Sequence, residues 1–308
     1  MRKPLTVLWF GGGQDSTAML YMYVHDLKWR EKYVGDNRFL VVMSDTGNEF
    51  PETYHHVASI KAFCELYDVE FYHLKPHMGY HPRTWPSLGS QMRRNDTIFS
   101  VGFPKSCTDN LKIKPCYNFL EGYLKKYYGY TSKRSKGVFY KYAAEFGKLT
   151  SFIGFAKGEE SRCADSPQLE LFPSSVKTKN YLPKYRRECV QHRYPLVEMR
   201  MSRADCQAYI SAQALPVPIP PNCMMCPFQN DPEIVYLERF HPNDWQQWVK
   251  LEANKLAKNG SKTRNLGVKG EKTLPEFLEN AKRKYGHWSD DQLREYRNSH
   301  GHCVKSKY

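Results

Sequence analysis

The sequence has no apolar stretch long enough to cross a membrane. After residues 1–4 (Met-Arg-Lys-Pro) it also lacks the apolar core of a signal peptide. These two absences exclude an integral membrane protein and predict a soluble, cytoplasmic protein with no membrane partner. With 41% hydrophobic and 25% charged residues among 308, the composition is that of a globular protein able to bury a core.

Acidic residues are scarce relative to basic ones. The chain has 32 Asp and Glu against 46 Lys and Arg, which gives a formal net charge of +14. A field of this sign attracts polyanions and disfavours cationic partners. We therefore expect either a nucleic acid or a small polyphosphate substrate among its ligands.

Cysteine occurs nine times, which is an odd number, and no secretion signal accompanies it. This argues against a framework of disulfides and favours reduced thiols, metal ligands or catalytic thiols.

The chain lacks two common phosphate-binding motifs, the Gly-Lys-Ser/Thr of a Walker loop and the G-x-G-x-x-G of dinucleotide-binding proteins. Instead, the apolar run 7–10 ends in Gly11-Gly12-Gly13, and the polar run Gln14-Asp15-Ser16-Thr17 precedes apolar residues at helical spacing. This order predicts a buried strand, a tight turn and a helix. Backbone N–H groups at such a helix start bind anions, most often phosphate.

Further strands are expected at 39–43, 69–74 and 149–156, a helix at 54–68, and a mostly helical tail at 232–308. In an open parallel sheet, the loops after the first two strands face one crevice. Asp45 and Glu49 of the second loop are therefore candidates to contact a magnesium ion or a ribose hydroxyl.

Two segments combine basic and aromatic residues. Segment 75–105, with Trp85, Arg93 and Arg94, suits a lid over a nucleotide or stacking on a base, and equally suits a solvated surface loop. Segment 117–148 suits nucleic-acid binding, and equally suits a solvated helical hairpin.

Four ordered strings carry a resemblance to a known family. The glycine turn resembles the Ser-Gly-Gly-x-Asp-Ser loop of the PP-loop ATP pyrophosphatase superfamily, with Gly11 in place of the leading Ser. Residues 45–53 (Asp-Thr-Gly-x-x-Phe-Pro-Glu-Thr) and 107–115 (Cys-Thr-x-x-Leu-Lys-Ile-x-Pro) resemble phosphoadenosine phosphosulfate (PAPS) reductase-like proteins. Cys223-x-x-Cys226-Pro227 resembles the sulfurtransferases of that group.

The resemblance implies a fold of class α/β: a PP-loop, adenine nucleotide α-hydrolase-like parallel sheet flanked by helices in residues 1–165. A Cys-bearing, mostly helical lobe would follow in residues 166–308. It also implies a site for ATP or PAPS with Mg²⁺ held by Asp15 and Asp45. The nucleotide-binding residues would be Gly11, Gly12, Gly13, Gln14, Asp15, Ser16, Thr17, Asp45, Thr46, Gly47 and Glu49.

A charged residue and a thiol complete the expected catalytic set beside Asp15. Segment 154–162 is similar to a family segment whose Arg lies near the nucleotide phosphates, which implies that Arg162 balances pyrophosphate, although Glu159 or Glu160 offers it a structural partner. Lys105 and Lys112 flank Cys107, which favours its thiolate as a nucleophile or ligand over a buried inert thiol.

Spacing makes Cys223 and Cys226 a candidate pair of metal ligands. Cys206 precedes them at a distance that a helix and a loop can close, with Cys107 or an exogenous ligand as the fourth. The resemblance implies an iron–sulfur cluster here, with zinc as the alternative. Thr108 breaks the Cys-Cys pair that holds the cluster of adenosine phosphosulfate (APS) reductases.

The resulting hypothesis is an enzyme that cleaves ATP between its α- and β-phosphates and adenylates an acceptor, with nucleic acid preferred, for sulfur transfer. A sulfur-donor protein or a thioredoxin-type reductant would be its partner. Two alternatives remain: a PAPS or APS reductase that makes sulfite, and a non-enzymatic nucleotide- or nucleic-acid-binding protein.

Overall fold

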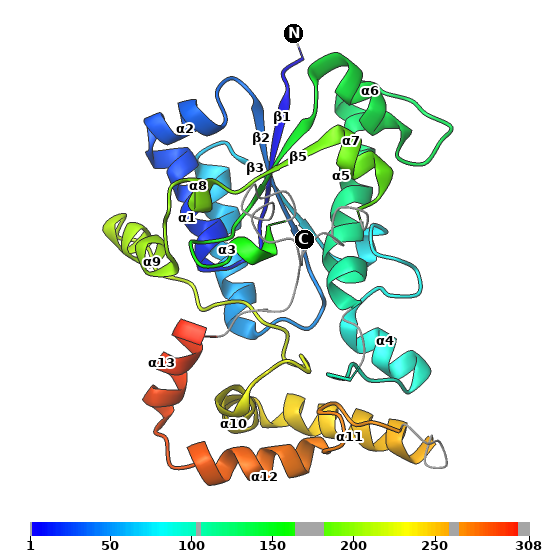
Figure 1. The fold of residues 1–308 in the computed structure, drawn as a ribbon, viewed down its shortest axis with the longest axis vertical. Helices are drawn as coiled ribbons and strands as arrows, with labels where there is room; N and C mark the ends of the chain where they lie inside the picture. The colour runs from blue at the N-terminus through cyan, green and yellow to red at the C-terminus, as the bar shows by residue number, and fades with distance from the viewer. Residues whose placement is uncertain (1, 103–105, 164–181, 259–264, 301–308) are drawn as a thin grey trace.

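The computed structural model describes residues 2–102, 106–163, 182–258 and 265–300 of the chain (Figure 1). At its centre lies one sheet made of β1 (Leu5–Trp9), β2 (Arg38–Ser44), β3 (Glu70–Leu74), β4 (Leu149–Ile153) and β5 (Val190–Arg193). The strands lie in the order β3-β2-β1-β4-β5, and every neighbouring pair is parallel. The predicted α/β class with a parallel sheet is confirmed.

The central strands are buried on both faces, which explains their nearly continuous apolar sequences. In β1, Leu5 and Val7 belong to one core and Leu8, with Phe10 just beyond the strand, to the other. This alternation follows from the two-residue period of a strand. Only a sheet covered by helices on both sides can bury such a strand.

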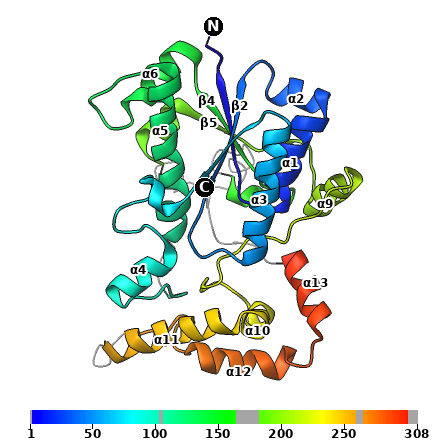
Figure 2. The ribbon, with the colours of Figure 1, turned by 180° about the vertical axis from the view of Figure 1, so that it is seen from behind.

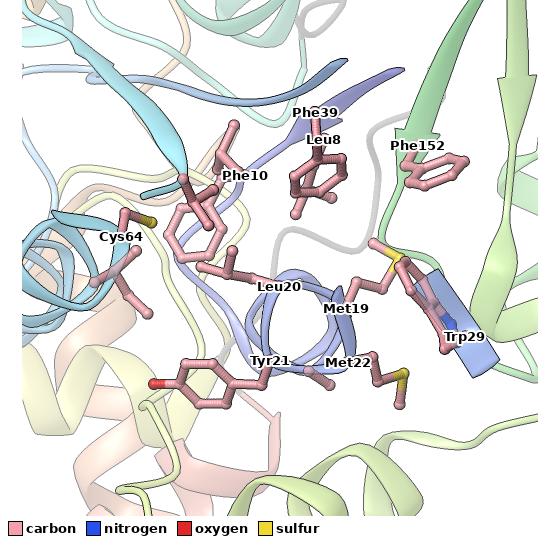
Figure 3. Packing of buried hydrophobic residues seen from close by; sticks show 14 of the residues in the cluster. Leu8, Phe10, Met19, Leu20, Tyr21, Met22, Trp29, Phe39, Cys64 and Phe152 are labelled. Atoms are coloured by element: carbon pink, nitrogen blue, oxygen red, sulfur yellow. The ribbon is translucent and has the colours of Figure 1, made fainter. Parts of the chain in front are cut away.

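Helices cover the two faces unequally (Figures 1 and 2). One face carries α1 (Gln14–His25), α2 (Leu27–Tyr33), α3 (Pro51–Leu66), α8 (Pro195–Glu198) and α9 (Arg203–Ala212). The other carries α5 (Lys114–Tyr128), α6 (Gly137–Phe146) and α7 (Lys184–Cys189). Figure 3 shows the first core around α1, where Met19 and Leu20 pack with Leu8 and Phe152 of the sheet.

A third layer lies beyond the carboxyl ends of the strands (Figure 1). It consists of α4 (Leu88–Asn95), α10 (Asp231–Phe240), α11 (Pro242–Lys258), α12 (Leu274–Tyr285) and α13 (Asp290–His300). Its core joins Trp248 and Leu274 to Phe50 and Met92. The expected helical C-terminal region with cysteines is therefore present, and among the described residues no helix is long and apolar enough to span a membrane.

The expected division of the chain after residue 165 stays a prediction. Two elements beyond that position lie against the sheet: β5 pairs with β4, and α9 packs on α1.

The strand order reverses between β1 and β4. The chain steps outward from β1 to β2 and β3, and then returns to the opposite side of β1 to add β4 and β5. At such a reversal the connections leave in opposite directions and open a crevice at the carboxyl edge, where α/β proteins bind ligands.

A single π-helical turn, Thr108–Ile113, leads into α5, and the Lys114 N–H bonds to the Asp109 carbonyl five residues back. π-turns are rare and concentrate at functional sites. The Leu111 carbonyl accepts a hydrogen bond of 2.6 Å from Ser44 Oγ at the end of β2. This bond fastens the segment that follows Cys107 to the carboxyl edge of the sheet.

We predict opposite effects for two Gly→Ala substitutions. Gly12 has φ +76°, and an added Cβ would lie 3.4 Å from both Met43 Cε and Thr53 Cγ2, so Gly12→Ala should lower the free energy of unfolding by about 1–2 kcal/mol. Gly122 lies in α5 with open space around it, and Gly122→Ala should raise it by about 0.5–1 kcal/mol. Urea denaturation of both variants measures these changes, and equal losses would contradict the strain at Gly12.

Candidate functional site

The glycine turn connects β1 to α1 at the reversal point of the sheet. Gly12 occupies the left-handed region, and Gly13 caps α1 with extended backbone and no side-chain hydrogen bond to the first turn. A Cβ on Gly13 would meet Pro221 Cδ at 2.8 Å. The proline-rich connector of residues 215–221, which precedes Cys223, therefore lies directly against the loop at Pro221. Among the described residues no side chain caps the first N–H groups of α1, so the glycine turn has the geometry that the predicted anion-binding site requires, and that site stays a prediction.

Three polar side chains of this loop have partners within the protein. Ser16 Oγ lies 3.2 Å from both the Gly11 N–H, which donates to it, and the Gly13 carbonyl, to which it donates. Thr17 Oγ1 lies 3.0 Å from His56 Nε2, and Gln14 Nε2 donates to the Pro218 carbonyl at 2.9 Å. Ser16 shapes the turn, whereas the Thr17 and Gln14 side chains bond to α3 and to the connector.

Asp15 lies in a compact cluster of charges. Its Oδ2 is 3.4 Å from Arg203 Nη2, which is also 3.4 Å from Glu159 Oε1. Asp15 Oδ1 is buried and accepts no hydrogen bond within the part of the chain that the structure describes. Burial raises the pKa of Asp15 above its ordinary value, and the positive charge of Arg203 offsets part of that rise.

The expected phosphate-balancing residue, Arg162, has the structural partner that the sequence also allowed. Its Nη1 lies 2.5 Å from Glu159 Oε1, and its guanidinium lies over the ring of Phe155 at 4.2 Å. Arg162 nevertheless remains near Asp15, whose pKa its charge lowers slightly. Arg203, which is not among the predicted site residues, is the cation directly beside Asp15.

The second expected loop, which follows β2, is held by hydrogen bonds within itself and to Tyr54 of α3. Asp45 Oδ1 accepts hydrogen bonds from the Gly47 N–H at 2.7 Å and the Tyr54 hydroxyl at 2.9 Å. Thr46 Oγ1 donates to Glu49 Oε1 at 2.9 Å, and Lys112 Nζ lies 3.6 Å from the same oxygen. Asp15 and Asp45 thus follow two neighbouring strands, β1 and β2, at the carboxyl edge of the sheet, and each has its own set of partners.

The cysteine turn of residues 223–226 is docked on this second loop. Glu49 and Cys223 form an antiparallel bridge, and the Met224 N–H donates to the Asn48 carbonyl at 2.9 Å. Asn48 Oδ1 accepts from the Met225 N–H at 3.0 Å. Residues 177 positions apart in sequence therefore share a hydrogen bond at the carboxyl edge.

Three of the four predicted metal ligands line one cavity of about 30 Å³, namely Cys107, Cys223 and Cys226. Cys206 is not among them, because it lies on the face of α9 that packs against α1. Among the described residues no three His, Cys, Asp or Glu side chains form a metal-binding group. These thiols do not fit a preformed cluster or zinc site, and we assign no metal-dependent step to them.

The thiol of Cys223 is protonated at neutral pH. Burial is the main cause and the Glu49 carboxylate adds to it, so the pKa of Cys223 lies well above its ordinary value. Lys269, buried with Nζ bonded to the Pro227 carbonyl at 2.7 Å, interacts electrostatically with Cys226. Burial lowers the pKa of Lys269 to about 8. Lys105, the other expected neighbour of Cys107, lies outside the described residues.

A cavity of about 70 Å³ lies at the sheet reversal, between the ends of β1 and β4. Gly11 and Ser44 line its edge, and Trp9 and Tyr117 supply aromatic walls. His192 reaches it from β5, with Nε2 buried and without a hydrogen-bond partner among the described residues. Burial lowers the pKa of His192 to about 3, so the ring is neutral. His192 is not among the site residues predicted from the sequence.

A second buried cation comes from the C-terminal helix. The Arg297 guanidinium lies over the Phe50 ring at 3.6 Å, directly after the Asp45–Glu49 loop. Within the described chain its Nε and Nη1 atoms are buried without hydrogen-bond partners, and burial lowers its pKa. The neighbouring Asn298 carbonyl accepts from Gln14 Nε2 at 3.3 Å. Helix α13 thereby touches both loops of the candidate site.

Fold and site together define an α/β protein with a glycine turn and thiols at the carboxyl edge of a parallel sheet. No family model matches the sequence, and no curated protein does. Among solved structures the chain is similar to the U34-tRNA thiolase NcsA from Methanococcus maripaludis with its 4Fe-4S cluster, at 12% sequence identity. The match covers 94% of this chain and 75% of that chain with a TM-score of 0.42, and assigns no role to any residue.

We predict that Asp15→Asn changes stability in a pH-dependent way. Because the folded pKa of Asp15 is raised, its contribution to stability is fully present in acid and is lost as pH rises through that pKa. The melting temperature of the variant relative to wild type should therefore increase from mildly acidic to neutral solution. Asp109→Asn, at an exposed pair with Lys114, is the control and should show no such trend.

We predict that Asn48→Ala releases the cysteine turn. The substitution leaves the Met225 N–H without its acceptor and should lower the free energy of unfolding by about 1–3 kcal/mol. It should also speed alkylation of Cys223, measured by mass spectrometry of the modified peptide. Asn280→Ala in α12 is the matched control, and equal Cys223 reactivity in the two variants would contradict the docking role of Asn48.

Proposed function

We propose that the protein is an ATP pyrophosphatase of the PP-loop class, related to PAPS reductase-like proteins, that adenylates an acceptor for sulfur transfer. One observation carries this proposal: the bridge between Glu49 and Cys223 brings thiols to the edge that also holds the glycine turn. An anion-binding loop alone indicates a nucleotide. Thiols at the same edge indicate that a sulfur nucleophile attacks the adenylated acceptor.

The nucleotide would lie across the reversal point of the sheet. The N–H groups of residues 12 and 13 and the first turn of α1 would bind the β- and γ-phosphates. The cavity at the sheet reversal, which Lys112 and Arg186 line beside the neutral His192, would contact the base. Asp15, whose Oδ1 has no partner in the described chain, and Asp45 would hold Mg²⁺, which offsets the charge on the leaving pyrophosphate.

The first chemical step joins the acceptor to AMP. An acceptor oxygen attacks the α-phosphorus, the bond to the β-phosphate oxygen breaks, and pyrophosphate leaves. Arg203 and Arg162, clustered with Asp15 and Glu159, would stabilise the negative charge that builds on the phosphates.

The second step transfers sulfur and uses two thiols. A sulfur-donor protein would load Cys107 as a persulfide, whose outer sulfur attacks the activated carbon and expels AMP. Cys226, in the same cavity and beside Lys269, would then attack Cys107 Sγ, which releases the thiolated product and leaves a disulfide. A thioredoxin-type reductant would restore both thiols.

Charge favours nucleic acid as the acceptor. The net charge is +14, and the α5–α6 region exposes Lys125, Lys126, Lys133 and Arg134. Lys136 of the same region instead pairs with Glu121 at 3.0 Å. A basic surface of this kind binds a phosphate backbone with strong salt dependence.

Pyrophosphate release from ATP and Mg²⁺, with and without RNA or DNA, tests the function. We expect release that depends on nucleic acid and falls about 100-fold or more in Asp15→Ala. Cys107→Ser should still release pyrophosphate but should incorporate no sulfur.

Two outcomes would favour the alternatives. Thioredoxin-dependent sulfite from PAPS without ATP turnover would identify a sulfonucleotide reductase. Salt-sensitive nucleic-acid binding with neither activity would identify a binding protein.

A further inference from the structure

The side-chain amide of Gln14 is buried and bonded within the protein, with only 3% of the residue exposed. Its Nε2 donates to the Pro218 carbonyl at 2.9 Å and to the Asn298 carbonyl at 3.3 Å. Its Oε1 accepts from Gln207 Nε2 at 2.9 Å. Because carbonyl oxygens only accept, these partners fix which end of the amide is the donor. Each N–H of the nitrogen has a carbonyl partner, so neither is left to donate to a phosphate.

Helix α9 contacts Gln14 and Asp15 through two residues one turn apart. Arg203 Nη2 lies 3.4 Å from Asp15 Oδ2, and Gln207, four residues later on the same face of α9, bonds to Gln14. The two contacts leave different atoms available. Asp15 keeps a buried oxygen with no partner in the described chain, whereas Gln14 keeps no donor. The side chains of these successive residues therefore serve different purposes.

The connector of residues 215–221 can be attached mainly through its carbonyls. Four of its seven residues are prolines, which have a fixed φ and no backbone N–H: Pro216, Pro218, Pro220 and Pro221. Such a segment is stiff and offers acceptors rather than donors. Pro218 is buried, and Gln14 Nε2 supplies the donor that its carbonyl requires.

Two contacts hold this connector against the glycine turn just before the thiols. Gln14 bonds to Pro218, and Gly13 lies so close to Pro221 that an added Cβ would be 2.8 Å from Pro221 Cδ. Cys223 follows Pro221 by two residues. Because the segment is stiff, fixing it at both points limits where the chain can place the cysteine turn.

We propose that Gln14 is a positioning residue whose amide binds the connector rather than the nucleotide, and so fixes the cysteine turn relative to the glycine turn. This inference rests on the proposed function, in which the nucleotide binds to backbone N–H groups of the same turn. One short segment then sets the positions of both the adenylated acceptor and the thiols. When the Gln14 donors are removed, sulfur transfer follows pyrophosphate release less often.

Gln14→Leu keeps the approximate size of the side chain and removes the amide. Without nucleotide, Cys223 of this variant should be alkylated about threefold or more faster than in wild type, as followed by mass spectrometry of the peptide that contains it. With ATP and acceptor, the sulfur incorporated per pyrophosphate released should fall about tenfold. This ratio reports positioning, because a smaller folded fraction lowers both products equally.

Gln207→Leu is the matched control. It removes the hydrogen bond at the other end of the same amide and leaves both donors of Gln14 on their carbonyls. Its Cys223 alkylation and its ratio of sulfur to pyrophosphate should therefore equal those of wild type. Gln14→Asn, whose amide ends one carbon short of the Pro218 carbonyl, is a second variant should Gln14→Leu fail to fold. It should change both measurements in the same direction.

Equal Cys223 alkylation in Gln14→Leu and Gln207→Leu, or a ratio of sulfur to pyrophosphate that stays at the wild-type value, would overturn the assignment. A weaker affinity of Gln14→Leu for a non-hydrolysable ATP analogue, with alkylation unchanged, would identify Gln14 as a nucleotide contact and would overturn it as well.

The two proposals fail separately. Faster Cys223 alkylation in Gln14→Leu, with no pyrophosphate release by wild type, would retain the attachment of the connector and reject the adenylation reaction. Acceptor-dependent pyrophosphate release by wild type, with unchanged alkylation in Gln14→Leu, would do the reverse.

Discussion

The parallel direction of all five strands is the constraint on which the rest of the structure depends. Each strand must end at the same edge, so each following loop contributes residues to one side of the molecule. The glycine turn, the Asp45–Glu49 loop and the charge cluster around Glu159 all follow strands, and they meet for this reason alone. Hydrophobic residues on both faces of β1 favour that geometry, because a parallel sheet is covered by helices on both faces and so buries Leu5, Val7 and Leu8 together.

The second organising contact combines backbone pairing with one side-chain acceptor, Asn48. The chain crosses from α9 through a proline-rich connector and pairs residues 223–225 with residues 48–49. Asn48 and the chain before Cys223 hold the cysteines in position, and Cys223 Sγ itself lies 3.3 Å from Thr46 Oγ1. Cys107, with Phe99 and Pro227, lies between the thiol-lined cavity of about 30 Å³ and a second cavity of about 260 Å³.

Local patterns in the sequence were sufficient to predict the first four strands, the glycine turn and the loop that carries Asp45. These depend on apolar runs and turn residues that act over a few positions. They were insufficient for β5, because its four residues pair with β4 after a long connection and carry no distinctive pattern. Cys206 was grouped with the other cysteines by spacing, whereas the apolar face of α9 turns it toward α1. Arg203 and Arg297 gain their significance from burial beside distant residues, which no local pattern records.

The hydrogen bond from Gln14 to the Asn298 carbonyl joins positions 284 residues apart, near the two ends of the described chain. During synthesis the N-terminal part of the chain leaves the ribosome first, and domains fold as their residues emerge. The first three strands can pair long before α13 is synthesised. Until then Gln14 lacks its hydrogen bond to the Asn298 carbonyl, and Phe50 lacks its contact with Arg297. A nascent chain with a formed sheet therefore carries an unfinished site. The protein is assembled from its sheet outward, and the candidate site at the carboxyl edge is completed last.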